Sequence, residues 1–130
     1  MTATSSASLR IMGRFDPELI SGKLGMSPSF VIFRGDKDIL GHPYRSDMWS
    51  LNSPLNSSTT LDKHLKWMAK TVKARYQVLR DIKKDKNRID IFCSVTFIGE
   101  NGFPLKHEDL DIFCDLGINI EVSLISLSGK

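Results

Sequence analysis

The sequence predicts a mixed α+β protein, and three residue patterns point to this fold class. Apolar side chains recur at steps of three and four over residues 61–86, which predicts a long amphipathic helix. Apolar and polar residues alternate over 89–97 and over 118–124, which predicts two half-buried strands. Shorter elements complete the order β-α-β-β-α-β-α-β. We therefore expect a two-layer ferredoxin-like sandwich, in which a mainly antiparallel sheet packs on one long and two short helices.

The first predicted elements are a strand and a short helix. Residues 1–5 are expected to be disordered, and alternation over 7–13 predicts the first strand. Asp16 is a preferred N-cap residue, Pro17 suits the first helical position, and Gly25 can adopt the positive φ that ends a helix.

Two strands and two loops are predicted between this helix and the long one. Strand-like runs occupy 30–33 and 48–51, and the polar segment 36–47 between them has little periodicity. Residues 52–59 are rich in Ser, Asn and Thr and form a second loop. The hydroxyl of Thr60 is expected to cap the long helix that follows.

The long helix is predicted to bury one face and to expose another. Its apolar stripe comprises Leu61, Leu65, Met68, Val72, Tyr76 and Leu79. Its basic stripe comprises Lys63, Lys66, Lys70, Lys73, Arg80 and Lys84. Trp67 lies off the apolar stripe, where an indole suits either stacking on a base or packing on a neighbouring strand.

A short acidic helix is predicted over 107–116, with Gly117 as its stop. Cys93 lies in an apolar strand pattern and Cys114 in an apolar helical turn. Neither has a cysteine or histidine neighbour at metal-ligand spacing, so both are expected to be buried free thiols.

Length and composition fit one soluble domain spanning 1–130. The chain has 130 residues, of which 41% are hydrophobic and 25% charged. No apolar run approaches the roughly 20 residues that cross a bilayer. The N-terminal residues lack both the basic start and the apolar segment of a signal peptide, so we expect a cytoplasmic protein without membrane contact.

The charge is unevenly distributed. The formal net charge is +3, but residues 61–86 hold nine Lys or Arg and three Asp, which leaves −3 for the rest of the chain. Such a charge distribution can steer an acidic partner onto the helix, although a lysine face also serves solubility alone.

Catalytic and metal-binding motifs are lacking in the sequence. His42, His64 and His107 lie far apart, and none belongs to a recognisable nucleophile motif. His64 is expected to be partly exposed on the surface. The one dense group of ligand-type residues begins at His107 and suits solvation of a helix, since its acidic residues favour the positive helix start. We therefore expect no enzyme activity, no bound metal and no small-molecule cofactor.

The loop after residue 33 is the first candidate contact surface. It gathers Arg34, Asp36, Tyr44 and Arg45, and loops of this composition often form contacts with partners. Trp49 follows directly and is expected to belong to the core.

Landmarks in the first half of the chain resemble a known family. They are Phe15, Pro17, Ile20, Leu24-Gly25, Pro28-Ser29, Gly35-Asp36, Trp49-x-Leu51-x-Ser53 and Leu61-x-x-His64-Leu65. This pattern resembles the bacterial domain-of-unknown-function family numbered 4279. The chain departs from it at Ile20-Ser21, where the family usually has Ile-Thr. The resemblance implies a small cytoplasmic protein without an assigned activity, and some relatives resemble immunity proteins that neutralise secreted bacterial toxins.

The sequence therefore favours a non-catalytic binding protein of the immunity type, which occludes the active site of a cognate protein toxin. The loop residues above and the lysines Lys66, Lys70 and Lys73 are the expected contacts. The acidic helix, through Asp109, Asp111 and Asp115, is an alternative contact. A second hypothesis is nucleic-acid binding by the lysine stripe, and no helix-turn-helix, RNA-recognition or zinc-finger motif accompanies it.

Overall fold

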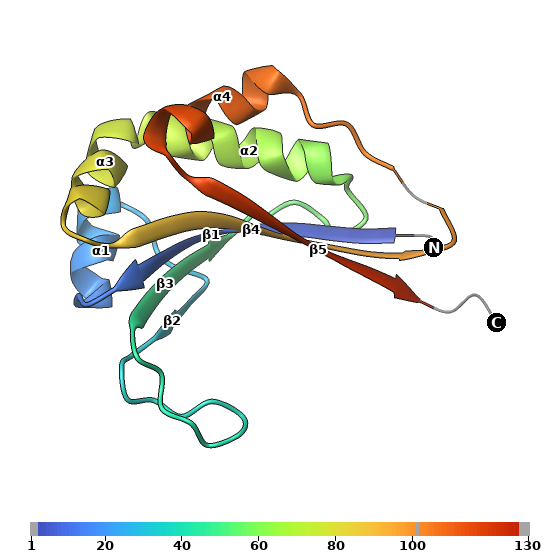
Figure 1. Cartoon of the computed structure of the whole chain (residues 1–130). Coiled ribbons are helices and arrows are strands. Elements are labelled where there is room, and N and C mark those ends of the chain that lie inside the picture. The colour runs from blue at the N-terminus through green and yellow to red at the C-terminus, as the bar shows by residue number, and fades with distance from the viewer. Residues whose placement is uncertain (1–2, 101, 128–130) are drawn as a thin grey trace.

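The computed structural model describes residues 3–100 and 102–127, and this part of the chain forms five strands and four helices (Figure 1). The strands are β1 (Ala3–Gly13), β2 (Phe30–Ile32), β3 (Asp47–Asn52), β4 (Arg88–Ile98) and β5 (Asn119–Leu127). The helices are α1 (Pro17–Leu24), α2 (Leu61–Ala74), α3 (Tyr76–Lys84) and α4 (His107–Leu116). The predicted mixed α+β class is confirmed.

All five strands belong to one sheet with the order β2-β3-β1-β4-β5. β1 pairs antiparallel with both β3 and β4, and β2 pairs antiparallel with β3. β5 joins β4 in parallel, which a crossover through α4 allows. The predicted ferredoxin-like arrangement therefore does not match in detail, because β5 extends the sheet beyond β4 and four helices replace the expected three.

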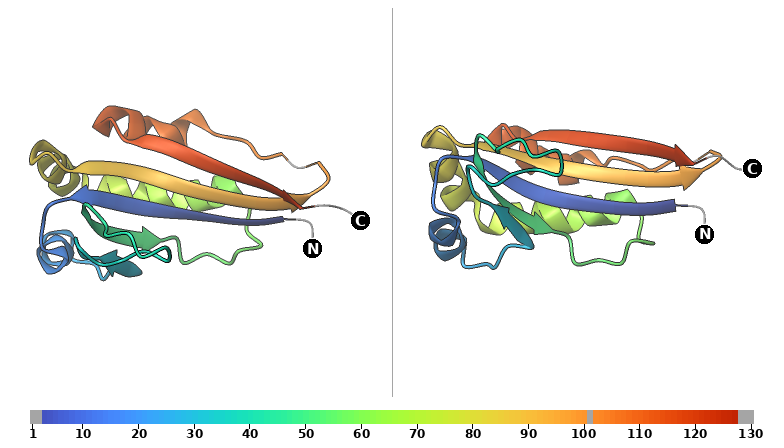
Figure 2. Two further views of the ribbon diagram at one scale, coloured as in Figure 1. Left: turned by 60° about the horizontal axis from the view of Figure 1, so that its bottom comes forward. Right: turned by 90° about the horizontal axis from the view of Figure 1, so that it is seen from below.

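The helices α2 and α4 cover one face of the sheet, and α1 and α3 lie at one end of it (Figure 1). Seen from below, the strands lie in front of α2, and the loop between β2 and β3 crosses this other face (Figure 2). Alternation along the strands places their apolar side chains under the helices. The fully buried core includes Leu9, Ile11, Trp49, Met68, Val72, Ile91 and Phe113.

The predicted long helix over 61–86 is wrong in one respect, because it is divided at Arg75. Arg75 has φ −122° and ψ 27°, outside the helical range, and separates α2 from α3. Its Nε donates a hydrogen bond to the carbonyl of Leu24, 3.0 Å away at the end of α1. The apolar periodicity continues across the break because α3 also buries Leu79 and Ile82 in the same core.

Local signals at the helix ends are confirmed with one exception. Asp16 Oδ1 accepts a hydrogen bond from the backbone N–H of Glu18, 3.0 Å away, and Gly25 ends α1 at φ 67°. Gly117 ends α4 at the same φ of 67°. Thr60 is the N-cap residue of α2, but its side chain makes no capping hydrogen bond, so that part of the prediction is wrong.

The start of the chain is more ordered than predicted. Residues 3–5 were expected to be disordered but belong to β1, whose pairing with β4 begins at Ala3. Residues 1–2 lie outside the described part of the chain. The remaining predicted strands lie within two or three residues of their observed ends.

The two cysteines differ in their surroundings. Both are free thiols, and Cys93 is buried as predicted. Burial raises the pKa of Cys93 to about 12, so its thiol is protonated and unreactive at neutral pH. Cys114 is exposed, so the prediction of a buried thiol is wrong there, because it lies on the outer side of α4.

His64 is buried, with 1% of its surface exposed, and the prediction of a surface histidine is therefore wrong. Its Nδ1 lies 2.8 Å from the hydroxyl of Ser53, so the ring links α2 to the loop before it. Nε2 has no hydrogen-bond partner among the described residues. Burial lowers the pKa of His64, although the nearby carbonyls of Asn56, Thr59 and Ser5 favour the protonated ring.

This burial predicts that acid destabilises the protein through His64. The folded pKa lies below the usual value of about 6.5, so the unfolded state binds the extra proton first as the pH falls. Stability is therefore unaffected above pH 6.5 and decreases as the pH falls through the lowered pKa of the folded state. Urea unfolding between pH 7.5 and 5 should show this loss, and His64→Gln should reduce it. The matched variant His107→Gln removes an exposed histidine, and the loss of stability that His64 causes should persist in it.

Candidate functional site

α2 supplies one wall of the candidate site. The buried residues of α2, among them Leu65, Met68 and Val72, fix its orientation on the sheet. This orientation places Lys66, Lys70 and Lys73 on the exposed side, at successive turns of the helix. Three cations thus form a basic wall along α2.

α4 supplies the opposite wall. Phe113 and Leu116 are buried and anchor this helix beside α2. Its exposed side carries three carboxylates, from Glu108, Asp111 and Asp115, and a fourth, from the buried Asp109, also lines the space beside α2. Glu108 and Asp109 lie in the first turn, where the helix dipole stabilises negative charge.

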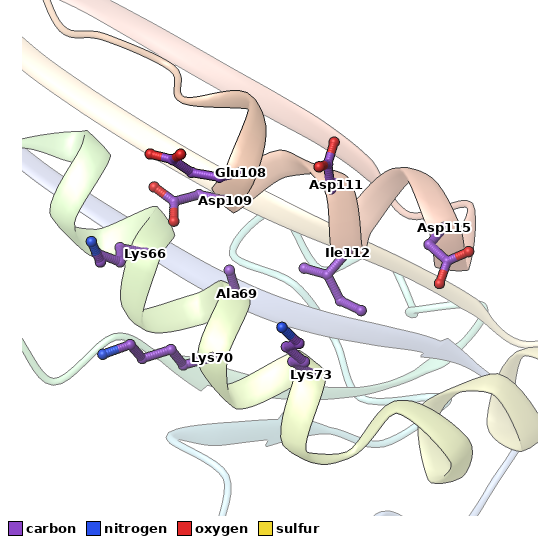
Figure 3. Close-up of a pocket in the computed structure, with 9 residues that line it drawn as sticks. All are labelled: Lys66, Ala69, Lys70, Lys73, Glu108, Asp109, Asp111, Ile112 and Asp115. Atoms are coloured by element: carbon purple, nitrogen blue, oxygen red, sulfur yellow. The ribbon is translucent and has the colours of Figure 1, made fainter.

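Between these walls runs a groove of about 440 Å³, here called the α2–α4 groove (Figure 3). Ala69 from α2 and Ile112 from α4 form its apolar floor. Asp109 is directed toward α2, whereas Asp111 points away from it (Figure 3). The lysine stripe and the acidic helix, which the sequence suggested as alternative contact surfaces, are therefore two walls of one groove.

The charges of the two walls do not pair with one another. No ion pair between an α2 lysine and an α4 carboxylate occurs among the described residues. The groove thus presents a row of positive charge and a row of negative charge to a ligand, with an apolar strip between them. A ligand that carries both signs of charge satisfies both walls.

The loop over 33–46 is the second predicted surface, and internal hydrogen bonds hold its shape. The carboxylate of Asp38 accepts from the backbone N–H groups of Leu40 and His42, each at 2.9 Å. Backbone hydrogen bonds of 3.0 and 2.8 Å join Gly35 and Asp36 to Tyr44 across the loop. The loop is therefore a preformed structure despite its irregular sequence.

The four predicted loop residues have different roles. Arg34 Nε lies 3.0 Å from Asp47, and Asp36 accepts from the N–H of Phe33 at 3.0 Å, so both stabilise the loop itself. Tyr44 and Arg45 line a shallow hollow of about 180 Å³ against the sheet. All four residues are exposed, but within the described chain the side chains of Tyr44 and Arg45 make none of the hydrogen bonds or ion pairs that hold the loop together.

Sequence reasoning missed the tip of this loop. Ile39 is 100% exposed and Leu40 is 76% exposed, and they are adjacent. Two consecutive aliphatic residues between Asp38 and Gly41, in a polar segment with turn residues, were the available signal.

The two predicted surfaces do not form one contact region. The groove lies on the helix-covered side of the sheet, and the 33–46 loop lies on the opposite side (Figure 1). Trp49 is completely buried, as predicted, and Trp67 is partly buried against the core.

The His, Cys, Asp and Glu side chains are spread over the part of the chain that the structure describes. No group of three or more His, Cys, Asp or Glu side chains there is arranged to hold a metal ion. His42 and His107 are exposed, and each lies about 4 Å from an aspartate one helical or loop turn away. None of the helices in residues 3–100 and 102–127 combines the length and apolar character needed to cross a membrane.

Fold and groove together define a small mixed α+β protein with a two-helix layer on a five-stranded sheet. The family model described as "Domain of unknown function (DUF4279)" matches residues 2–127, and the chain belongs to this family. Neither a curated protein nor a solved structure matches the chain.

Proposed function

We propose that this chain is a non-catalytic protein-binding module of the immunity type. It acts in the cytoplasm, where it neutralises a cognate toxin by direct binding and occlusion of the toxin's active site. The α2–α4 groove is the contact surface. The observation that carries this proposal is that a basic wall lies opposite an acidic wall, with an apolar floor between them.

This arrangement favours a polypeptide partner over a nucleic acid. A protein segment can present apolar side chains to Ala69 and Ile112 and charges of both signs to the walls. The phosphates of a nucleic acid would gain from Lys66 and Lys70 but would meet the carboxylates of α4 across the same groove. The alternative of nucleic-acid binding by the lysine stripe is therefore weaker.

The first experiment is a pull-down from the native cell, with half of the lysate treated with nuclease. We expect one protein at fixed stoichiometry in both halves. Material that disappears after nuclease treatment contradicts the proposal and supports nucleic-acid binding.

The contact surface is then tested by charge reversal against the purified partner. The triple variant Lys66→Glu, Lys70→Glu, Lys73→Glu should slow association about tenfold or more at low salt and speed dissociation. The matched control Lys63→Glu, Arg80→Glu, Lys84→Glu changes the net charge by the same amount at exposed cations outside the groove. It should slow association less and leave dissociation unchanged. Equal effects of the two triples contradict direct contact at the groove.

Exchange of the walls separates charge pattern from net charge. Adding Glu108→Lys, Asp111→Lys and Asp115→Lys to the first triple restores the net charge of +3 but inverts the two walls. We expect binding to remain weak in this variant. Full recovery would show that only net charge matters and would contradict the groove as the contact surface.

A further inference from the structure

The outer edge of β5 is unpaired in the described chain. β5 is the last strand of the sheet and pairs with β4 along its whole length, so its other side carries free backbone donors and acceptors. It also extends beyond α4, which leaves its second half uncovered by a helix (Figure 1). Leu124, Ile125 and Leu127 in this half are 61%, 45% and 48% exposed.

This edge lacks the features that normally protect an edge strand. Protective features are short length, proline, bulges and charged side chains. β5 has nine residues without proline, and its one charged residue is Glu121. The segment 122–127 consists of four apolar residues and two serines and carries no charge.

The opposite edge of the sheet differs in each respect. β2 has only three residues and is followed at once by the turn that begins the 33–46 loop. It offers too few backbone groups to accept a nine-residue strand. An association through β5 therefore closes when two β5 edges meet, rather than continuing from β5 to β2 of the next molecule.

We infer that β5 pairs antiparallel with β5 of a second copy, which forms a two-fold symmetric dimer with a continuous ten-stranded sheet. Full overlap of the strands places Ser123 on the symmetry axis. Val122 of each copy then faces Leu124 of the other on the helix side of the sheet. In this register Glu121 of each copy faces Ile125 of the other, so no two like charges lie directly opposite each other.

Sedimentation analysis over a concentration series tests the dimer. The unmodified chain should show a monomer–dimer equilibrium, and Leu124→Lys should raise its dissociation constant by about tenfold or more. Leu19→Lys is the matched control, because it makes the same chemical change on α1 at a leucine that is 62% exposed. It should leave the equilibrium unchanged.

Cysteine cross-linking tests the register. In a Cys114→Ser background, which removes the exposed thiol, Ser123→Cys should form a disulfide-linked dimer on mild oxidation. Ser27→Cys, at an exposed position before β2, should not.

Three results would overturn the inference. The first is a monomer up to about 1 mM, the weak limit of specific association. The second is an equal response of the dimer to Leu124→Lys and Leu19→Lys. The third is a dimer that Ser123→Cys fails to cross-link. None of them depends on the proposed toxin partner.

Discussion

Replacing Trp49 by alanine is expected to lower the free energy of unfolding by about 3–5 kcal/mol. Trp49 has 0% of its surface exposed and lies between Ile11 of β1 and Val31 of β2 in the sheet register. Its Nε1 also donates a hydrogen bond to the hydroxyl of Ser21, 3.0 Å away on α1. Truncation therefore removes a large buried side chain and a link between the sheet and α1.

Two further variants separate these contributions. Ser21→Ala removes the acceptor and leaves the buried indole N–H unpaired, at an expected cost of about 1–3 kcal/mol. Trp67→Ala is the matched control. Trp67 is only partly buried, so its replacement should lower the free energy of unfolding clearly less. Urea unfolding followed by circular dichroism avoids the loss of tryptophan fluorescence. Equal costs for Trp49→Ala and Trp67→Ala would contradict the assignment of Trp49 to the centre of the core.

The parts of the fold that depend on local interactions could be predicted from the sequence. Asp16 and Pro17 start α1, and Gly25 and Gly117 end helices, because capping and positive φ involve only neighbouring residues. The alternation in β4 likewise reports directly which side chains point toward the helices.

The features that were missed depend on contacts between distant segments. The break at Arg75 is stabilised by the Leu24 carbonyl, 51 residues away in sequence, and the apolar periodicity carries no sign of it. His64 is buried because the loop before α2 folds over it and Ser53 supplies a partner. Histidine is a polar residue, and its type alone predicts a position on the surface. The folded loop buries His64 instead.

The two walls of the groove were predicted separately, but the groove itself was not. The lysines of α2 and the carboxylates of α4 were each recognised as a charged helix face, but they appeared as alternatives. Whether they face each other depends on how β4 and the residues after it bring α4 beside α2. Only the tertiary structure shows that a basic wall and an acidic wall lie opposite each other. This arrangement favours a protein partner over nucleic acid.

Asp47 is expected to be the residue on which the position of the 33–46 loop depends most. Asp47 is buried, with 3% of its surface exposed. Its carboxylate accepts hydrogen bonds from the backbone N–H groups of Phe15 and Arg34, at 3.0 and 2.9 Å. The Arg34 guanidinium lies 3.0 Å away. Asp47→Ala should lower the free energy of unfolding by about 2–4 kcal/mol, because two backbone donors and a guanidinium lose their acceptor.

The same carboxylate predicts a pH dependence. Burial alone would raise the pKa of Asp47, but the hydrogen bonds from Arg34 and Phe15 and the nearby guanidinium groups of Arg34 and Arg14 lower it overall. Its contribution to stability is therefore fully present above the usual aspartate pKa of about 4 and is lost as the pH falls through the lowered value. In Asp47→Ala this part of the acid destabilisation should be absent.

Asp16→Ala is the matched control for Asp47→Ala, since it removes an exposed carboxylate that accepts one backbone hydrogen bond. Its expected cost is about 1 kcal/mol. Amide hydrogen exchange provides the local readout. The N–H groups of Phe15 and Arg34 should exchange faster in Asp47→Ala, and their exchange rates should not change in Asp16→Ala. If both variants cost the same and these two amides stay protected, Asp47 does not hold the loop. In that case the backbone hydrogen bonds within the loop, including those between Asp36 and Tyr44, would suffice to fix its shape.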